Sequence, residues 1–276
     1  MGYRTLWLDN ESDLRGVDFS NTLFLTEGQV DGRIPLRNDC YYILHNCSAS
    51  KYSAISTQNQ IKIQVYTDDI LLVPDAIKMD TCIYYHLSDQ CLYMPWATDL
   101  LPSEIDKVKE GIQDVSMENC VYWIGTVGEG EFGNLNELTP FIQACEESGI
   151  KFVQQTHVSV ELNKQLTQKS YIAPTIVGRW QSQKGYIPCR VFKNISYGKM
   201  GVTNSKRVYE LFEGKIVFNS DTYQLFFDAE QAMESMTLNQ LYELMDLVKE
   251  KHTYINRIHT MLDFFELINP NVSNKS

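Results

Sequence analysis

The sequence predicts an α/β protein built mainly on parallel sheets. From Val121 onward, strand-like and helix-like segments alternate over roughly 100 residues, which is typical of βαβ units. In the first hundred residues, short apolar and aromatic runs occur between turns, and several lack polar alternation. Strands of that kind are buried on both faces, as in a parallel sheet.

The first half is predicted to be a series of short strands. The helices expected between them are weak in sequence, so the α/β interpretation of this half depends on the strands alone. The expected strands are residues 5–9, 22–26, 41–45, 61–67, 82–86 and 91–96.

A proline-framed segment at 97–118 is the expected joint between two domains. Within it, Ser103 followed by Asp106 predicts a helix that a serine caps. The expected domains are residues 1–100 and 101–265, and a polar tail follows at 269–276.

The second half predicts a regular succession of elements. Strands are expected at 121–127, 151–157, 171–178, 199–205 and 213–220. Helices are expected at 135–149, 160–169, 188–198 and 228–233, with one long amphipathic C-terminal helix over 238–268.

The composition excludes several classes of protein. With 276 residues, 43% of them hydrophobic, the chain can bury a substantial core. A net charge of −11 argues against broad binding to nucleic acid or to anionic membranes. The N-terminus lacks a signal-peptide pattern and no apolar window is long enough to span a bilayer, so a cytoplasmic location is expected.

The cysteines predict a reducing environment. They occur at positions 40, 47, 82, 91, 120, 145 and 189, without CxxC or zinc-finger spacing. Reduced, mostly buried thiols are therefore favoured over a disulfide scaffold or a metal site.

One long stretch of this acidic chain contains no acid. Residues 162–209 hold nine Lys or Arg and no Asp or Glu. At the average acid frequency of the chain, a stretch of that length would hold roughly six acids. A local binding site for a small anion is one interpretation, and a solvated basic surface is the other.

The predicted helix at 188–198 concentrates this charge. Pro188 suits its first turn and Gly198 its C-terminal cap. One face is apolar, and the other carries hydrogen-bond donors at helical spacing: Arg190, Lys193, Asn194 and Tyr197. A diphosphate fits such a surface, because an arginine fork, a lysine and the helix N-terminus can share its charge.

A glycine-rich turn at 125–134 follows one strand and precedes a helix, as a phosphate-binding loop does. Gly125, Thr126 and Gly128 are its candidate binding residues. The turn lacks GK[ST] and the full GxGxxG pattern, and Glu129 and Glu131 would repel a phosphate, so a plain turn is an equal alternative.

Three segments, CRVFKNISYGKMGVTNS, ELFEGKIVFNSDTYQLF and VKEKHTYINRI, resemble the C-terminal half of GT-B glycosyltransferases over about residues 119–265. The resemblance is to the CgeB-like group, and more faintly to the cytosolic glycosyltransferases of large DNA viruses. The matching positions are Arg190, Phe192, Gly198, Asn204, Leu211, Phe212, His252, Thr253, Tyr254 and Arg257.

The resemblance implies two Rossmann-like domains with a cleft between them. The C-terminal domain would bind a nucleotide sugar and the N-terminal domain a glycan or glycoprotein acceptor, without a metal or other cofactor. A UDP-linked pentose or hexose is favoured as donor. Arg190 and Lys193 would then stabilise the charge of the departing diphosphate.

Lys193 departs from the family pattern, which has glutamate at this position to grip the donor ribose. A lysine cannot accept the hydroxyl protons of the ribose, so that role would fall to other residues. The candidates are Asn194, Thr203, Asn204 and Ser205.

An inverting transfer also needs a base near the acceptor hydroxyl. His45, Glu27 and Asp39 occupy strand-end or loop positions and are the candidates. His157 ends an expected strand and could approach the donor. Trp180, with Tyr186 nearby, could stack on a base or a sugar, or could be an ordinary loop aromatic.

Two other functions remain open. A protein of the same fold could bind a glycan or nucleotide without turnover. A sugar epimerase or a phosphoribosyl-type transferase would also use a nucleotide, but an epimerase needs a GxGxxG loop near its N-terminus, and this chain has none there.

Overall fold

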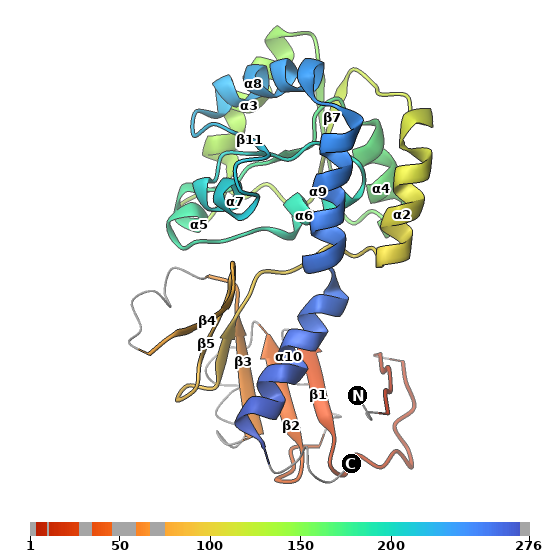
Figure 1. Cartoon of the computed structure of the whole chain (residues 1–276), viewed down its shortest axis with the longest axis vertical. Coiled ribbons are helices and arrows are strands. Elements are labelled where there is room, and N and C mark those ends of the chain that lie inside the picture. Colours follow the sequence, from red (N-terminus) through yellow and green to blue (C-terminus); the bar gives the residue numbers. More distant parts are fainter. Residues whose placement is uncertain (1–3, 10, 28–34, 46–58, 67–74, 271–276) are drawn as a thin grey trace.

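The computed structural model describes residues 4–9, 11–27, 35–45, 59–66 and 75–270. Over these residues the chain is mixed α/β with parallel sheets, which confirms the predicted class. Figure 1 shows two lobes, with a sheet in the lower one and a helix-rich α/β layer in the upper one. The last long helix returns from the upper lobe to the lower one.

In the described part of the N-terminal lobe, six strands form one sheet in the order β1-β2-β3-β6-β5-β4. The first four in that order are parallel, and β5 and β4 are antiparallel to their neighbours because tight turns join them. The strands are β1 (Leu23–Glu27), β2 (Tyr41–His45), β3 (Gln60–Gln64), β4 (Ile77–Asp80), β5 (Ile83–His86) and β6 (Cys91–Tyr93).

Two predictions for this half are wrong. The run at 5–9 is not a strand: Trp7 is exposed, and among the described residues no strand pairs with this segment. The edge strand β4 was not expected, because its residues are all exposed and its sequence IKMD lacks a buried apolar face.

The C-terminal lobe contains short parallel strands, and the structure describes all of residues 75–270, where they lie. Strands β7 (Cys120–Ile124) and β8 (Lys151–Gln155) pair with each other. A second group has the order β11-β10-β9. Its members are β9 (Pro174–Thr175), β10 (Val202–Thr203) and β11 (Val217–Phe218).

The strands of the second group are shorter than predicted, and one side chain explains where two of them end. Asn204 follows β10, and its side-chain amide both accepts a hydrogen bond from the Val177 N–H and donates one to the Val177 carbonyl, each at 2.9 Å. Beyond β9, the Asn204 side chain thus makes the hydrogen bonds that a neighbouring strand backbone would otherwise make with Val177.

Helices cover these strands. The predicted helix at 160–169 is present with those bounds, and the helices predicted at 135–149 and 188–198 are present with slightly shorter bounds. The helices are α2 (Pro102–Gly111), η3 (Ile112–Asp114), α3 (Leu135–Glu147), α4 (Val160–Lys169), α5 (Arg179–Gln183), α6 (Cys189–Ser196), α7 (Lys206–Leu211), α8 (Thr222–Ser235), α9 (Leu238–Lys251) and α10 (Tyr254–Ile268).

Helix α2 begins two residues earlier than predicted. Pro102 occupies its first position, so Ser103 lies inside the helix and does not cap it. The carboxylate of Glu104 accepts a hydrogen bond from the Leu101 N–H at 2.7 Å, so a first-turn acid bonds back to the N-cap residue.

The single helix expected over 238–268 is wrong, because the chain breaks it at His252–Thr253 into α9 and α10. Thr253 caps α10: its hydroxyl accepts from the Asn256 N–H at 3.4 Å, and the Asn256 side chain accepts from the Thr253 N–H at 2.9 Å. This reciprocal pair starts a new helix with a new direction.

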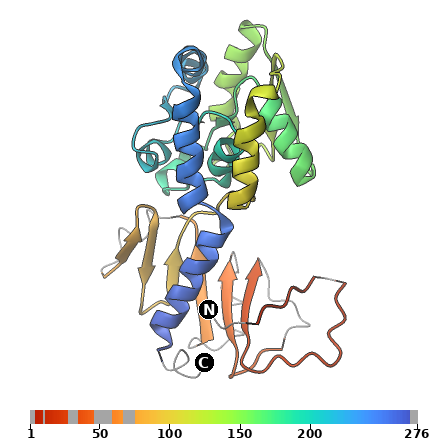
Figure 2. The same ribbon diagram turned by 45° about the vertical axis from the view of Figure 1, so that its right-hand side comes forward.

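Beyond the break, α10 packs on the N-terminal sheet and not on the C-terminal lobe (Figure 2). The Phe265 ring lies 4.9 Å from that of Tyr41 on β2, and the Phe264 ring 5.5 Å from that of Tyr85 on β5. Residues 254–265, expected in the C-terminal domain, therefore complete the N-terminal lobe.

The two chain crossings between the lobes are joined by Arg257, which is 1% exposed. Its guanidinium donates to the carbonyls of Pro95 and Trp96 on the first crossing, at 2.8 and 3.4 Å. On the second crossing it donates to the Lys251 carbonyl at 3.0 Å and to His252 Nδ1 at 2.9 Å. One side chain thereby bonds both segments that pass between the lobes.

His252 has a structural role at this junction. Its ring stacks on Phe192 of α6 at 4.5 Å, and its carbonyl accepts from the Thr98 N–H at 3.0 Å. Burial and the adjacent Arg257 lower the pKa of His252, so the ring is neutral and accepts the guanidinium proton.

We expect Arg257→Met to lower the free energy of unfolding by about 3 kcal/mol, because it leaves several buried acceptors without a donor. Urea denaturation measures this. The control is Arg15→Met, which removes an exposed arginine paired with Asp13 and should change stability by less than about 0.5 kcal/mol. Equal stability of the two variants would contradict the role of Arg257.

Candidate functional site

Most of the lysines in the acid-free stretch are neutralised by acids from outside it. The ion pairs are Lys164 with Glu161, Lys169 with Glu118, Lys193 with Asp99 and Lys206 with Glu210. Arg190, which is partly buried, and Lys199, which is buried, form no ion pair with any described residue.

Arg190 lies at the carboxyl end of β7. It belongs to the first turn of α6, and its guanidinium carbon lies 3.7 Å from the ring centroid of Trp123, a β7 residue that is 2% exposed. Gly125 follows this strand with φ of +132°, and a Cβ added there would lie 2.8 Å from Nη2 of Arg190. Ligands of parallel α/β sheets bind at this end of the strands.

The environment of Arg190 favours an anion. Desolvation lowers the pKa of Arg190 to about 10, so it stays protonated at neutral pH. The Trp123 indole N–H beside it also lacks an acceptor among the described residues. An enclosed cation without a counter-ion is costly, and a bound anion would supply the missing charge.

The other donors on the predicted face of α6 have protein partners. Lys193 pairs with Asp99 at 2.9 Å, and the Tyr197 hydroxyl donates to the same carboxylate at 2.7 Å. The Asn194 amide donates to the Ala173 carbonyl at 2.8 Å. The expectation that Lys193 shares the charge of a diphosphate with Arg190 is therefore corrected. Asp99 lies in the crossing between lobes, outside the acid-free stretch.

The glycine-rich turn closes on itself. The Gly128 N–H donates to Asn134 Oδ1 at 3.1 Å, and its carbonyl accepts from the backbone N–H groups of Asn134 and Leu135 at 3.0 Å. Thr126 is exposed. Of the three predicted binding residues in this turn, the structure brings only Gly125 against Arg190.

The predicted ribose-binding residues also have structural bonds. The Thr203 hydroxyl donates to the Thr175 carbonyl at 3.0 Å, and Ser205 caps α7 by accepting from the Val208 N–H at 3.4 Å. Asn204 closes the end of β9, as described above. These residues hold the strand ends in place.

Aromatic residues join the lobes near this site. The Trp180 ring lies 5.1 Å from Tyr66 of the N-terminal lobe and 4.9 Å from the exposed Phe132 of the glycine-rich turn. Tyr186 forms an antiparallel bridge with Tyr66. His157 is exposed after β8, and the structure shows no contact between it and Arg190.

His45 ends β2 but is sealed from solvent, at 3% exposure. Its ring centroid lies 3.8 Å from that of Trp96, and neither ring nitrogen bonds any described residue. Burial lowers the pKa of His45 to about 4, so the ring is neutral at pH 7.

The other two candidate bases lie at opposite ends of the sheet. Glu27 ends β1 in register with His45, and its side chain lies outside the described residues. Asp39 precedes β2, at the far end of the strand, and Arg37 pairs with it at 2.6 Å and lowers its pKa to about 2. Asp39 thus lies at the opposite end of β2 from His45.

Two residues of this site escaped the sequence analysis. Trp123 was treated only as part of a strand, although its place two residues before Gly125 is a usable signal. Asp99 belongs to another segment of the chain, and no local pattern links it to Lys193.

The cysteines agree with the predicted reduced state where they are described. Among the described residues Cys189 is partly exposed, the others are buried, and none forms a disulfide; Cys47 lies outside the described residues. The described residues contain no cluster of three or more His, Cys, Asp or Glu that could hold a metal ion. They also include no helix that is both long and apolar enough to span a bilayer.

Comparisons with known proteins give no family assignment. No family model matches the chain, and no curated protein matches it. The chain is similar to a solved UDP-forming α,α-trehalose-phosphate synthase from Burkholderia xenovorans, with 10% identity, a TM-score of 0.46, and coverage of 82% of this chain and 68% of that one.

A second similar structure is an α,α-trehalose-phosphate synthase (UDP-forming) from the same organism in complex with glucose-6-phosphate. It has 10% identity and a TM-score of 0.48, with coverage of 80% of this chain and 61% of that one. At TM-scores below 0.5 these likenesses assign neither a fold family nor an activity to this chain.

We expect His45 to make stability depend on pH. Its pKa is near 6.5 when unfolded and about 4 when folded, so its contribution is complete above pH 6.5 and declines as pH falls toward 4. His45→Phe should therefore show a smaller loss of unfolding free energy than the wild type between pH 7 and 4. Urea denaturation across that range measures it.

The control for this experiment is His259→Gln, which changes an exposed histidine on α10. It should follow the wild-type profile. If the His45→Phe profile also matched the wild type, the buried ring would not be the source of the pH dependence.

Proposed function

We propose that this protein is a glycosyltransferase that binds the diphosphate of a nucleotide-sugar donor at Arg190. The observation that carries the proposal is a partly buried guanidinium with no acidic partner among the described residues, stacked on Trp123 and placed against Gly125. The resemblance of the sequence around Arg190 to GT-B enzymes supports the choice of this reaction over other uses of a nucleotide.

In this proposal Arg190 stabilises the charge that develops on the leaving nucleotide. Its stacking on Trp123 holds the guanidinium before the donor arrives, so little reorganisation is needed during the reaction. The N-terminus of α6, where Arg190 lies, adds unpaired N–H groups and partial positive charge. Lys193 does not contact the diphosphate in this proposal, because it forms an ion pair with Asp99.

The acceptor is proposed to bind on the N-terminal lobe. Trp96 packs over His45, and Asp39 lies at the other end of β2 in an ion pair with Arg37. Neither His45 nor Asp39 is therefore favoured as the base. Glu27, at the carboxyl end of β1, stays as the candidate. The proposed donor is a UDP-linked pentose or hexose, transferred without a metal to a glycan or glycoprotein.

We expect Arg190→Ala to weaken UDP binding by about 10- to 100-fold, since it removes a charge-assisted contact with the diphosphate. Calorimetric titration with UDP measures this, and uridine provides a probe without phosphate whose affinity should not change. Arg179→Ala is the matched control, because Arg179 is an exposed arginine of the same acid-free stretch. Wild-type affinity for UDP in Arg190→Ala would overturn the site.

We expect Gly125→Ala to weaken UDP binding while Arg190 itself is retained. The new methyl group would lie within 2.8 Å of Nη2 and displace the guanidinium, and the φ of +132° would strain an alanine. The control is Gly130→Ala, a turn glycine with positive φ and nothing within 4 Å of its added Cβ. Equal UDP affinities of the two variants would contradict the contact between Gly125 and Arg190.

Turnover separates an enzyme from a binding protein of the same fold. The wild type, incubated with a panel of UDP- and GDP-linked sugars and no acceptor, should release the nucleoside diphosphate slowly, and Arg190→Ala should not. Binding of a nucleotide sugar without any hydrolysis or transfer would support the non-catalytic alternative.

A further inference from the structure

A second cation, Lys199, is buried in the C-terminal lobe. It precedes β10 and so lies at the amino end of a strand, whereas Arg190 lies at a carboxyl end. Lys199 is 9% exposed and borders a cavity of about 320 Å³. The cavity lies at the amino ends of β9 and β10, beside the junction of α8 and α9, whereas Arg190 lies at the carboxyl end of β7. In Figure 1 that junction is on the side of the upper lobe away from the N-terminal sheet.

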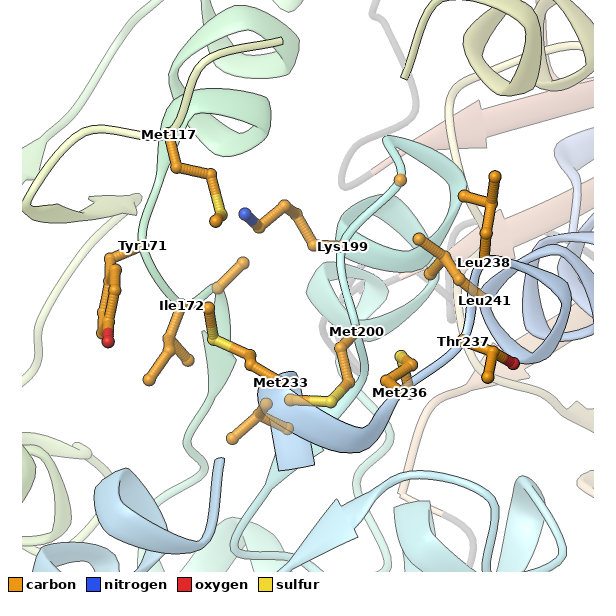
Figure 3. Close-up of a pocket in the computed structure, with 13 residues that line it drawn as sticks. Met117, Tyr171, Ile172, Lys199, Met200, Met233, Met236, Thr237, Leu238 and Leu241 are labelled. Atoms are coloured by element: carbon orange, nitrogen blue, oxygen red, sulfur yellow. The ribbon is translucent and has the colours of Figure 1, made fainter. Parts of the chain in front are cut away.

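The cavity wall is largely apolar, with the Lys199 amine at one end and the hydroxyl groups of Tyr171 and Thr237 elsewhere in its lining (Figure 3). Methionines make up much of its wall, and their flexible, polarisable side chains adapt to ligands of irregular shape. Met117, 52% exposed, lies at its edge. The apolar side chains that line it include Met117, Ile172, Met200, Met233, Met236 and Leu241.

The amine of Lys199 supplies the polar end. In Figure 3 it extends toward Met117 along one side of the cavity. It donates to the Ser170 carbonyl, which uses one of the three protons of the ammonium group, and no carboxylate in the described part of the chain pairs with it. Burial lowers the pKa of Lys199 to about 8, so the charged form predominates at neutral pH.

A lone carbonyl does not compensate the burial of a lysine. An enclosed ammonium without a counter-ion is destabilising, and a neutral side chain would satisfy Ser170 at lower cost. The position of this charge at the end of an apolar cavity matches a ligand with an anionic head and a hydrocarbon body.

We propose that this cavity binds a medium-chain carboxylate, with its carboxylate on Lys199 and its chain among the methionines. Such a ligand supplies the counter-ion that the ammonium lacks and fills the apolar space. The site is separate from the proposed nucleotide-sugar site, so it is an additional binding function of the C-terminal lobe.

Calorimetric titration with decanoate, below its micelle concentration and without nucleotide, tests the proposal. We expect one site per chain and at least a tenfold lower affinity for decanol, which has the same chain without the charge. Lys199→Met should reduce decanoate affinity to that of decanol. Lys206→Met, an exposed lysine paired with Glu210, is the control and should bind as the wild type does.

Met233→Trp should fill the cavity and abolish the binding of both compounds. Equal affinity of the wild type for decanoate and decanol would overturn the role of the charge without any variant. Absence of decanoate binding, or unchanged binding in Met233→Trp, would overturn the site. Arg190→Ala should retain decanoate affinity and Lys199→Met should retain UDP affinity, so the two proposals fail independently.

Discussion

The fold depends on a buried guanidinium at the place where the chain passes twice between its lobes. Arg257 lies in the first turn of α10. Its guanidinium donates to the Pro95 carbonyl, in the segment that leaves the N-terminal sheet, and to the Lys251 carbonyl at the end of α9. Because one rigid, planar group serves both crossings, neither can shift without breaking bonds on the other. The lobes are thereby held in one arrangement by a contact that belongs to neither sheet.

This junction also fixes the candidate site. His252 stacks on Phe192 of α6, and the Thr98 hydroxyl of the first crossing shares a hydrogen bond with Ser196 at 2.6 Å. Both contacts position α6, the helix that carries Arg190. A single apolar core also runs from Ile43 of the N-terminal sheet to Val191 of α6. The placement of the guanidinium over Trp123 therefore depends on residues remote from the site itself.

The sequence predicted the class of fold and the helix around Arg190, because these depend on local patterns. Pro188 caps α6, and Gly198 ends it with φ of +88°. What it did not predict depends on distant contacts. The break between α9 and α10 depends on the Thr253 cap and on the packing of α10 against the N-terminal sheet. The amphipathic pattern of the sequence runs through the break and indicates neither.

The same distinction applies to the site. An absence of acids along the chain correctly marked a region rich in cations, but Asp99 and Glu118 reach into it from elsewhere and neutralise Lys193 and Lys169. Counting charges in a window cannot reveal such pairs. The three-dimensional contacts distinguish Arg190 and Lys199, which have no acidic partner among the described residues, from the lysines that form ion pairs.

The return of α10 to the first sheet has a consequence for biosynthesis. The apolar side of β2 and β5 is covered by Phe264 and Phe265, which are synthesised only after helices α2 to α9. Until then the growing chain exposes Tyr41 and Tyr85 on an incomplete layer. The N-terminal lobe is therefore completed only after the C-terminal lobe has been synthesised, although its strands are made first. Termination before α10 would leave an aggregation-prone fragment with this apolar surface exposed.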